Sequence, residues 1–191
     1  MKKYVFLVLT FISSLTFAQN NNLTSIYAWT AGAGVNIVDN DGRQFKNVFK
    51  TKHWNFGNPI SLNIENKFSD VFAANFAITL NKLTPKNEQN FQDIDKDRTL
   101  FAVDATVKFI YDGYFLPDER FDPFEAYIVS GFGYTTIGIN SSMFFDIGFG
   151  FNFWFFPEFG LRLQTLGKFA FTDQTYLNNY LQHTAEVIYR F

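Results

Sequence analysis

The side chains that most often carry out catalysis are scarce in this chain. Histidine occurs only as His53 and His183, and cysteine does not occur at all. A thiol nucleophile is therefore excluded, and a histidine base would need a hydroxyl nucleophile within hydrogen-bonding reach. His53 lies in a polar stretch, and His183 is followed by Thr184 and Ala185. We predict no catalytic residues, no bound cofactor and no enzymatic activity.

One acidic run has the spacing of a metal loop. Asp93, Asp95 and Asp97 form an Asp-x-Asp-x-Asp pattern, and oxygen ligands at alternate positions begin calcium loops of the EF-hand type. The sixth position of such a loop is normally glycine because the chain turns sharply there. Here that position is Arg98, which leads into an apolar alternating segment. The run is a weak metal candidate, and we expect a solvated acidic loop.

Eight segments alternate between apolar and polar residues, which is typical of strands with two different faces. One of them sets Phe145, Ile147 and Phe149 against Asp146 and Gly148. Each is long enough to cross a bilayer as a tilted strand, which takes about 9–11 residues. We expect polar connections between them, including a short loop over 135–141. The segments cover approximately 27–38, 57–66, 71–83, 99–111, 124–134, 142–155, 160–171 and 180–191.

The polar face of these segments carries ionisable side chains. An Arg or Lys that faces lipid at the bilayer midplane costs roughly 2–4 kcal/mol, so these groups are expected to point inward. An eight-stranded barrel has an interior that side chains fill, and opposite charges are tolerated there as hydrogen-bonded pairs. The predicted interior polar network is Glu65, Asp104, Lys108, Glu125, Asp146, Arg162, Lys168, Glu186 and Arg190. The predicted neighbours are Lys108 with Glu125, Asp146 with Lys168, and Arg162 with Glu186.

The composition agrees with one membrane-embedded domain. The chain has 27 Phe, 9 Tyr and 3 Trp, yet its mean hydropathy is close to zero. Strands that are apolar on alternate residues give this combination, because the two faces cancel in the average. Without Lys2 and Lys3, 14 basic side chains stand against 18 acidic ones, so nucleic acid is not an expected partner. We predict an all-β fold, an eight-stranded antiparallel transmembrane up-and-down β-barrel.

Both ends of the chain have the character of export signals. Residues 1–18 combine a basic start with an apolar run and small residues before Gln19, so we predict a cleaved signal peptide. The barrel is then expected to occupy residues 19–191. The last segment alternates up to Tyr189 and Phe191, and this ending is similar to the assembly signal of bacterial outer-membrane barrels. We expect the barrel assembly machinery to contact this strand.

Several short stretches, in order along nearly the whole mature length, carry a family resemblance. They are residue 29 and residues 34–39, 103–108, 122–123, 131–135, 152–155 and 182–185. By these stretches the chain resembles the N-terminal barrel of OmpA-family outer-membrane proteins of Bacteroidota, such as flavobacteria. The resemblance implies an OmpA/OmpX-like barrel in the bacterial outer membrane, in contact with lipid and lipopolysaccharide. That family continues into a peptidoglycan-binding domain, whereas this chain stops at Phe191, so a cell-wall tether is not expected.

Several functions are compatible with these patterns. The leading hypothesis is a non-enzymatic barrel that acts as a scaffold or as a subunit of a larger complex with other outer-membrane proteins. A small-solute porin or transport barrel is the first alternative. A lipid A-modifying barrel enzyme is the second, although lipid A deacylases place a serine two residues after their histidine and His183 lacks one. A secreted soluble barrel of lipocalin type, with its apolar face inward, is the third.

Overall fold

The computed structural model describes residues 29–39, 54–85, 96–111, 123–172 and 177–191. The predicted signal peptide, residues 1–18, lies outside the described residues. Within the described ranges, no helix is long and apolar enough to span a membrane. All of the regular secondary structure described there is β-strand.

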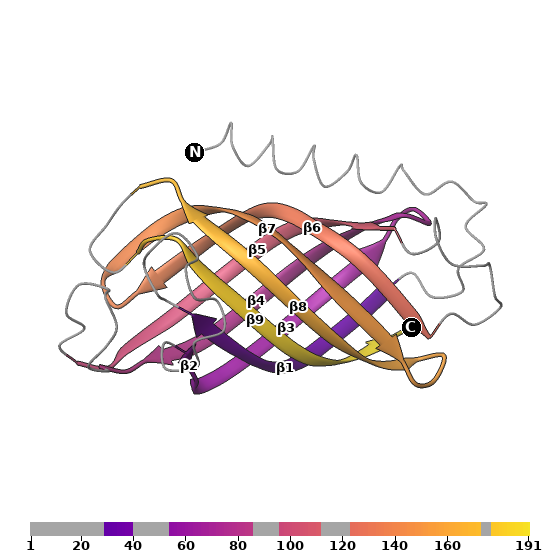
Figure 1. Ribbon diagram of the computed structural model, residues 1–191, viewed down its shortest axis with the longest axis horizontal. Helices are drawn as coiled ribbons and strands as arrows, with labels where there is room; N and C mark the ends of the chain where they lie inside the picture. Colours follow the sequence, from indigo (N-terminus) through magenta and orange to yellow (C-terminus); the bar gives the residue numbers. More distant parts are fainter. Residues whose placement is uncertain (1–28, 40–53, 86–95, 112–122, 173–176) are drawn as a thin grey trace, which may run out of the picture.

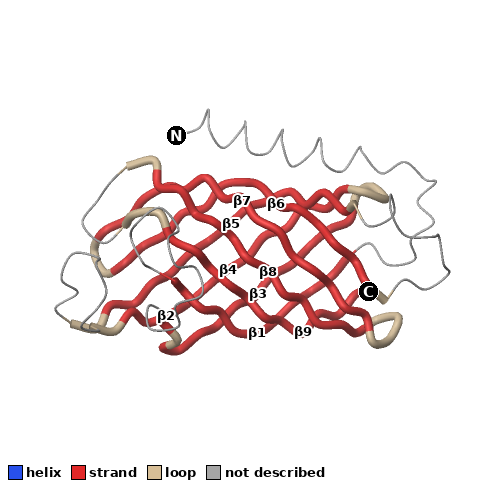
Figure 2. Tube along the Cα trace, in the orientation of Figure 1, coloured by secondary structure: helices blue, strands red, loops and turns tan. Residues whose placement is uncertain are grey.

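The strands form one closed antiparallel wall, seen from the side in Figure 1 and as a Cα trace in Figure 2. Each long strand pairs with its neighbour in the chain, and the first long strand also pairs with the last. Closure leaves no exposed sheet edge, which is what a strand assembly needs in lipid. The predicted eight-stranded antiparallel barrel is confirmed, with eight long strands in the wall and one additional strand of two residues. The strands are β1 (Trp29–Asp39), β2 (Trp54–Asn55), β3 (Gly57–Lys67), β4 (Phe72–Leu83), β5 (Arg98–Ile110), β6 (Phe124–Ile137), β7 (Asn140–Trp154), β8 (Phe159–Ala170) and β9 (Tyr180–Arg190).

The seam between β1 and β9 closes the barrel. It runs without interruption from the Thr30–Arg190 pair to the Asp39–Leu181 pair. The two strands approach closely at Gly34, where a Cβ atom would lie 2.0 Å from the carbonyl oxygen of Ala185. Gly34 is therefore required by the neighbouring backbone. We call the end where β1 starts and β9 finishes the terminal end, and the opposite end the loop end.

The wall is irregular where β1 separates from β3 near the loop end. Their pairing stops at Gly34 and Ser61, and the short strand β2 pairs with the last two residues of β1 instead. The side chain of Asn36 bridges the gap by donating to the carbonyls of Ile60 at 2.8 Å and Leu80 at 2.7 Å. Side-chain amides thus replace missing ladder bonds. The pattern of alternation did not predict β2.

One predicted loop is wrong. Residues 135–141 belong mostly to strands, because β6 continues to Ile137 and β7 begins at Asn140. The two strands remain paired up to this point, and only Gly138 and Ile139 are left as the turn. Gly138 has a φ of 62°, a conformation that glycine adopts without steric cost. Mixed small and polar residues in this stretch resemble a loop in composition, although they continue the alternation of the hairpin.

The apolar face of the wall points outward and the polar face inward. Phe149 on β7 has 51% of its surface exposed, whereas Arg162 on β8 has 1%. Phe132, Ile147 and Val187 are likewise exposed on the outer wall. A soluble lipocalin-type barrel would have the opposite arrangement, so that alternative does not fit. An apolar outer wall around charged groups is the arrangement of a barrel that spans a membrane.

Candidate functional site

Arg162 is the centre of a cluster of charged side chains inside the barrel. Its Nε donates to Oδ1 of Asn152 at 3.0 Å, and its Nη1 donates to Oδ1 of Asn63 at 2.8 Å. Its Nη2 donates to Oε2 of Glu65 at 2.9 Å, and its Nη1 lies 3.9 Å from Oε2 of Glu186. The bonded groups come from β3, β7 and β9, so one guanidinium on β8 ties together four strands.

The other members of this cluster complete the charge balance. Lys108 on β5 places Nζ 2.5 Å from Oε2 of Glu65 and 4.2 Å from the ring centroid of Tyr127. Glu186 accepts hydrogen bonds from Ser61 at 2.6 Å and from Asn63. Two carboxylates thus balance two cations, and hydrogen bonds satisfy most of their remaining polar atoms, as buried charges require. The Arg162 cluster is Arg162, Lys108, Glu65 and Glu186.

A second cluster lies closer to the loop end. Lys168 on β8 places Nζ 2.5 Å from Oδ1 of Asp104 and 3.2 Å from Oδ2 of Asp146. All three side chains are buried. Gly133 leaves the space that they occupy, since a Cβ there would lie 2.3 Å from Oδ1 of Asp104 and 2.9 Å from Nζ of Lys168. The Lys168 cluster is Lys168, Asp104 and Asp146.

The predicted neighbour pairs can be compared with this geometry. Asp146 and Lys168 lie together, and Arg162 and Glu186 are in contact at the longer distance given above. The pairing of Lys108 with Glu125 is wrong. Lys108 on β5 binds Glu65 on β3, past the intervening strand β4, while Glu125 accepts from Asn152 at 2.5 Å and lies 3.7 Å from Lys67. Long side chains reach past the neighbouring strand, so strand adjacency alone does not determine their partners.

Arg190, the ninth predicted member of the network, lies apart from both clusters. Its guanidinium is 4.1 Å from the ring of Trp154 at the terminal end, and its Nε donates to the carbonyl of Pro157. Trp154 itself points inward and is buried. Arg190 therefore lies at the terminal end of the barrel, next to an indole ring.

An apolar layer inside the loop end was not anticipated from the sequence. It lies where the strands end, beyond the Lys168 cluster, and its residues are nearly inaccessible to solvent. In each strand these apolar residues occupy the same alternate positions as the inward-facing polar residues. A change from polar to apolar residues along the inward face could therefore have predicted the layer. Leu177 joins the layer from the segment before β9. The apolar layer is Val38, Leu83, Leu100, Ala102, Ile137, Phe144, Leu177 and Tyr180.

The candidate metal and acid–base residues are only partly described. Asp93, Asp95 and His53 lie outside the described residues. Asp97 forms an exposed ion pair with Lys82, with a distance of 2.6 Å between Oδ2 and Nζ. His183 lies on the outer wall and places Nδ1 3.0 Å from Oγ1 of Thr165. Within the described ranges, no group of three or more His, Cys, Asp or Glu side chains is arranged to hold a metal.

Aromatic rings gather on the outer wall at the terminal end. Phe159 and Tyr189 have ring centroids 4.8 Å apart, and Tyr189 stacks on Phe191 at 6.0 Å. Trp29 and Phe72 are also exposed at this end of their strands. Outer-membrane barrels carry girdles of aromatic residues at their interfaces, so this band fits a membrane interface. The predicted assembly residues, Tyr189 and Phe191, belong to the band.

Comparison with known proteins identifies the fold. No protein-family model matches the chain, and no curated protein matches it. OprG of Pseudomonas aeruginosa matches with a TM-score of 0.58 and 10% identity, over 86% of this chain and 96% of that one. Neisserial surface protein A (NspA) matches with a TM-score of 0.54 and 13% identity, over 87% of this chain and 98% of that one. The N-terminal β-barrel domain of P. aeruginosa OprF matches with a TM-score of 0.53 and 10% identity, over 86% of this chain and 98% of that one.

These identities are low, so the likeness establishes the fold. The outer wall adds an independent physical argument, because exposed Phe149 and Phe132 would be unfavourable in water and are suited to lipid. The predicted location in the bacterial outer membrane agrees with the fold and with the apolar outer wall. The chain folds as an eight-stranded barrel of the kind found in bacterial outer membranes, and that membrane is where its surface belongs.

Proposed function

We propose that this protein is a non-enzymatic, closed outer-membrane barrel that acts as a scaffold or as a subunit of a larger outer-membrane assembly. Its interior serves stability, and its outer loops and lipid-facing wall serve contact with other molecules. Lipopolysaccharide and other outer-membrane proteins are the partners that this location offers. The short sequence stretches shared with OmpA-family barrels of Bacteroidota support the same reading.

The observation that carries this proposal is the filling of the lumen by two successive layers. Towards the terminal end, the Arg162 cluster crosses the lumen from β8 to β3. Towards the loop end, the apolar layer closes the same space with fully buried side chains such as Leu100 and Phe144. A solute would have to separate buried ion pairs and then an apolar packing layer. Barrels of this strand number enclose side chains, whereas open aqueous channels occur in larger ones.

Conductance distinguishes this proposal from a small-solute porin. The purified barrel, refolded in detergent and inserted into planar lipid bilayers, is expected to give no steady channels above the leak of the lipid. A known open porin, refolded and inserted in the same way, controls for insertion. Heat-dependent migration on gels checks that the barrel is folded. Steady, reproducible channels from the folded barrel would favour the porin alternative.

The partner role needs a separate test. Gentle solubilisation of membranes, followed by purification on a tagged copy of the barrel, is expected to recover one or more outer-membrane proteins in fixed ratio. A matched control is a tagged barrel of similar size from the same membrane. Recovery of the same proteins with both baits, or of none, would remove the support for a subunit role.

A lipid A-modifying enzyme remains a second candidate because of one contact. His183 and Thr165 place an imidazole nitrogen beside a hydroxyl on the lipid-facing wall, 3.0 Å apart. Mass spectrometry of lipid A from a deletion strain and its parent is expected to show the same acyl chains. If the two differ, complementation with Thr165→Val tests whether the hydroxyl acts as a nucleophile. Restoration by the unmodified protein and not by the variant would favour the enzyme.

Two further parts of the proposal concern export and assembly. Residues 1–18 are proposed to be removed as a signal peptide, which N-terminal sequencing of the mature protein checks. The aromatic end of β9, with Tyr189 and Phe191, is proposed as the contact for the barrel assembly machinery. Replacement of Phe191 by Ser is expected to lower the amount of folded barrel in the outer membrane while leaving in vitro refolding largely intact.

A further inference from the structure

The Lys168 cluster has an unbalanced charge. The carboxyl groups of Asp104 and Asp146 share the single ammonium of Lys168, so with both acids ionised the cluster carries one net negative charge. All three side chains are buried, and a buried net charge is strongly unfavourable unless it is compensated. The neighbouring Arg162 cluster cannot supply the balance, because its two cations already face Glu65 and Glu186. A proton or a bound cation beside these carboxylates would balance the negative charge.

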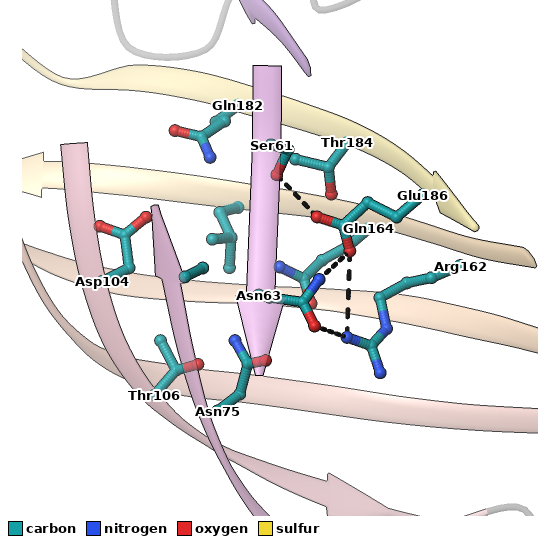
Figure 3. A pocket seen from close by; sticks show the side chains of 12 residues that line it. Ser61, Asn63, Asn75, Asp104, Thr106, Arg162, Gln164, Gln182, Thr184 and Glu186 are labelled. Atoms are coloured by element: carbon teal, nitrogen blue, oxygen red, sulfur yellow. Dashed lines mark hydrogen bonds and ion pairs between the residues drawn. The ribbon is translucent and has the colours of Figure 1, made fainter. Parts of the chain in front are cut away.

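A small cavity lies next to the carboxylate of Asp104. Its volume is ≈ 10 Å³, which is about the space of one water molecule or one small ion. Figure 3 shows Asp104, Thr106 and Asn75 on one side of it and Gln182 above them. Arg162 lines the other side, where its donors are bonded to Asn63, Asn152 and Glu65.

Four polar atoms on the wall of the cavity have no hydrogen-bond partner among the described residues. They are Oδ2 of Asp104, Oδ1 of Asn75, Oε1 of Gln182 and Oγ1 of Thr106. Each of these residues is more than nine-tenths buried. Nε2 of Gln182 donates to Oγ1 of Thr79 at 3.1 Å, which leaves Oε1 of the same amide on the cavity side. All four atoms are oxygens, and three of them can only accept hydrogen bonds.

The chemistry of these oxygens selects the ligand. A water molecule, together with the hydroxyl of Thr106, can donate to the three acceptors but supplies no charge. A proton supplies the charge but occupies a single oxygen. A small monovalent cation supplies the charge and coordinates several oxygens at once, as amide and carbonyl oxygens do in place of a hydration shell. We infer that the barrel interior binds one Na⁺ ion between Asp104, Asn75, Thr106 and Gln182.

The inference is tested by the stability of the refolded barrel in detergent. Urea midpoints are measured in NaCl and in choline chloride, at the same ionic strength and pH, with each salt present from the start of refolding. An ion that binds only the folded state raises the midpoint with its concentration, so the midpoint is expected to be higher in NaCl. Broadening of the ²³Na resonance by the folded barrel, and not by the urea-unfolded chain, reports binding directly.

Asp104→Asn is expected to raise the stability of the barrel in the absence of Na⁺. The variant leaves Asp146 and Lys168 as a neutral pair, so it is expected to be more stable than the unmodified barrel in choline chloride and to lose the dependence on Na⁺. Thr106→Val keeps the charge and removes one ligand, and is expected to shift the Na⁺ dependence to severalfold higher concentration. Asp97→Asn, which removes an exposed carboxylate, is the matched control and should retain the full dependence.

Two results would overturn the inference. Equal midpoints in the two salts, with a midpoint that varies only with pH, would show that a proton balances the cluster. Urea midpoints that depend neither on the salt nor on pH would indicate that water occupies the cavity. The measurement does not involve conductance, so neither result bears on whether the barrel is closed.

Discussion

Nη2 of Arg162 lies 2.9 Å from Oε2 of Glu65, although β9 and β1 separate their two strands in the wall. The contact therefore spans part of the lumen and connects two strands that are not adjacent in the wall. A backbone ladder connects only adjacent strands. Long charged side chains supply additional contacts between strands that are not adjacent.

Glu65→Gln should destabilise the barrel strongly. The variant keeps the shape of the side chain but leaves Lys108 and Arg162 with one carboxylate fewer, and breaking a buried pair in this way costs roughly 3–5 kcal/mol. Urea unfolding of the refolded barrel, followed by tryptophan fluorescence, gives the change in free energy of unfolding.

Lys82→Met is the control for that measurement, because it removes an ion pair whose side chains are 41% and 48% exposed. Exposed pairs contribute about 0–1 kcal/mol. Equal losses in Glu65→Gln and Lys82→Met would mean that the interior network contributes no more than a surface contact.

Gly133→Ala should also be destabilising, by about 1–3 kcal/mol, through overpacking. The added methyl group would stand 2.3 Å from Oδ1 of Asp104 and 2.7 Å from Oδ2 of Asp146, so the Lys168 cluster would have to shift. Ser130→Ala on the outward face of the same strand provides the control, and its free energy of unfolding should stay close to that of the unmodified barrel. A Gly133→Ala barrel as stable as the control would show that the cluster has room to move.

Phe149→Arg tests the orientation of the wall. Phe149 lies near the middle of β7 and faces outward, where an arginine in the bilayer costs roughly 2–4 kcal/mol. Phe156→Arg, at the exposed turn after β7, should cost about 0–1 kcal/mol because the interface is close to water. Refolding equilibria in lipid vesicles measure both changes. Similar costs at the two positions would contradict a membrane boundary between them.

Leu100→Ala tests the apolar layer. Leu100 is fully buried inside the loop end, and truncation of such a leucine costs about 2–5 kcal/mol. Its neighbour Phe101 points to the outside of the barrel, so Phe101→Ala removes more atoms but leaves no internal void. Urea midpoints should fall further for Leu100→Ala. The reverse order would mean that the layer is loosely packed.

The alternation of residues was sufficient to predict the barrel because each strand has different surroundings on its two sides. Asp146 between Phe145 and Ile147 indicates a strand with one polar and one apolar face. The ends of the strands were predicted less well. Residues 135–141 look like a loop in composition, yet their backbone continues the hairpin from Ile137 to Asn140.

The partners inside the barrel were only partly predictable. Lys168 and Asp146 face each other on adjacent strands, so the register gives their proximity directly. Lys108 on β5 meets Glu65 on β3 past the strand between them, and such a contact depends on the tilt of the strands and on which side chains are small. Leu83 and Leu100 at the loop end belong to no motif and carry no charge. Their packing in the apolar layer follows from closure of the barrel, which brings their strands around one lumen.

The register of β1 against β9 has a consequence for how the molecule forms. Val35 pairs with Ala185 across the seam, so this pairing joins the first and the last long strand of the chain. Contacts between residues so distant in sequence are slow to form, because the entropy of a very long loop is lost before they contribute. Partial hairpin stacks would expose two unsatisfied strand edges to hydrocarbon. We therefore expect insertion to be an all-or-none event, completed by the meeting of the first and last strands.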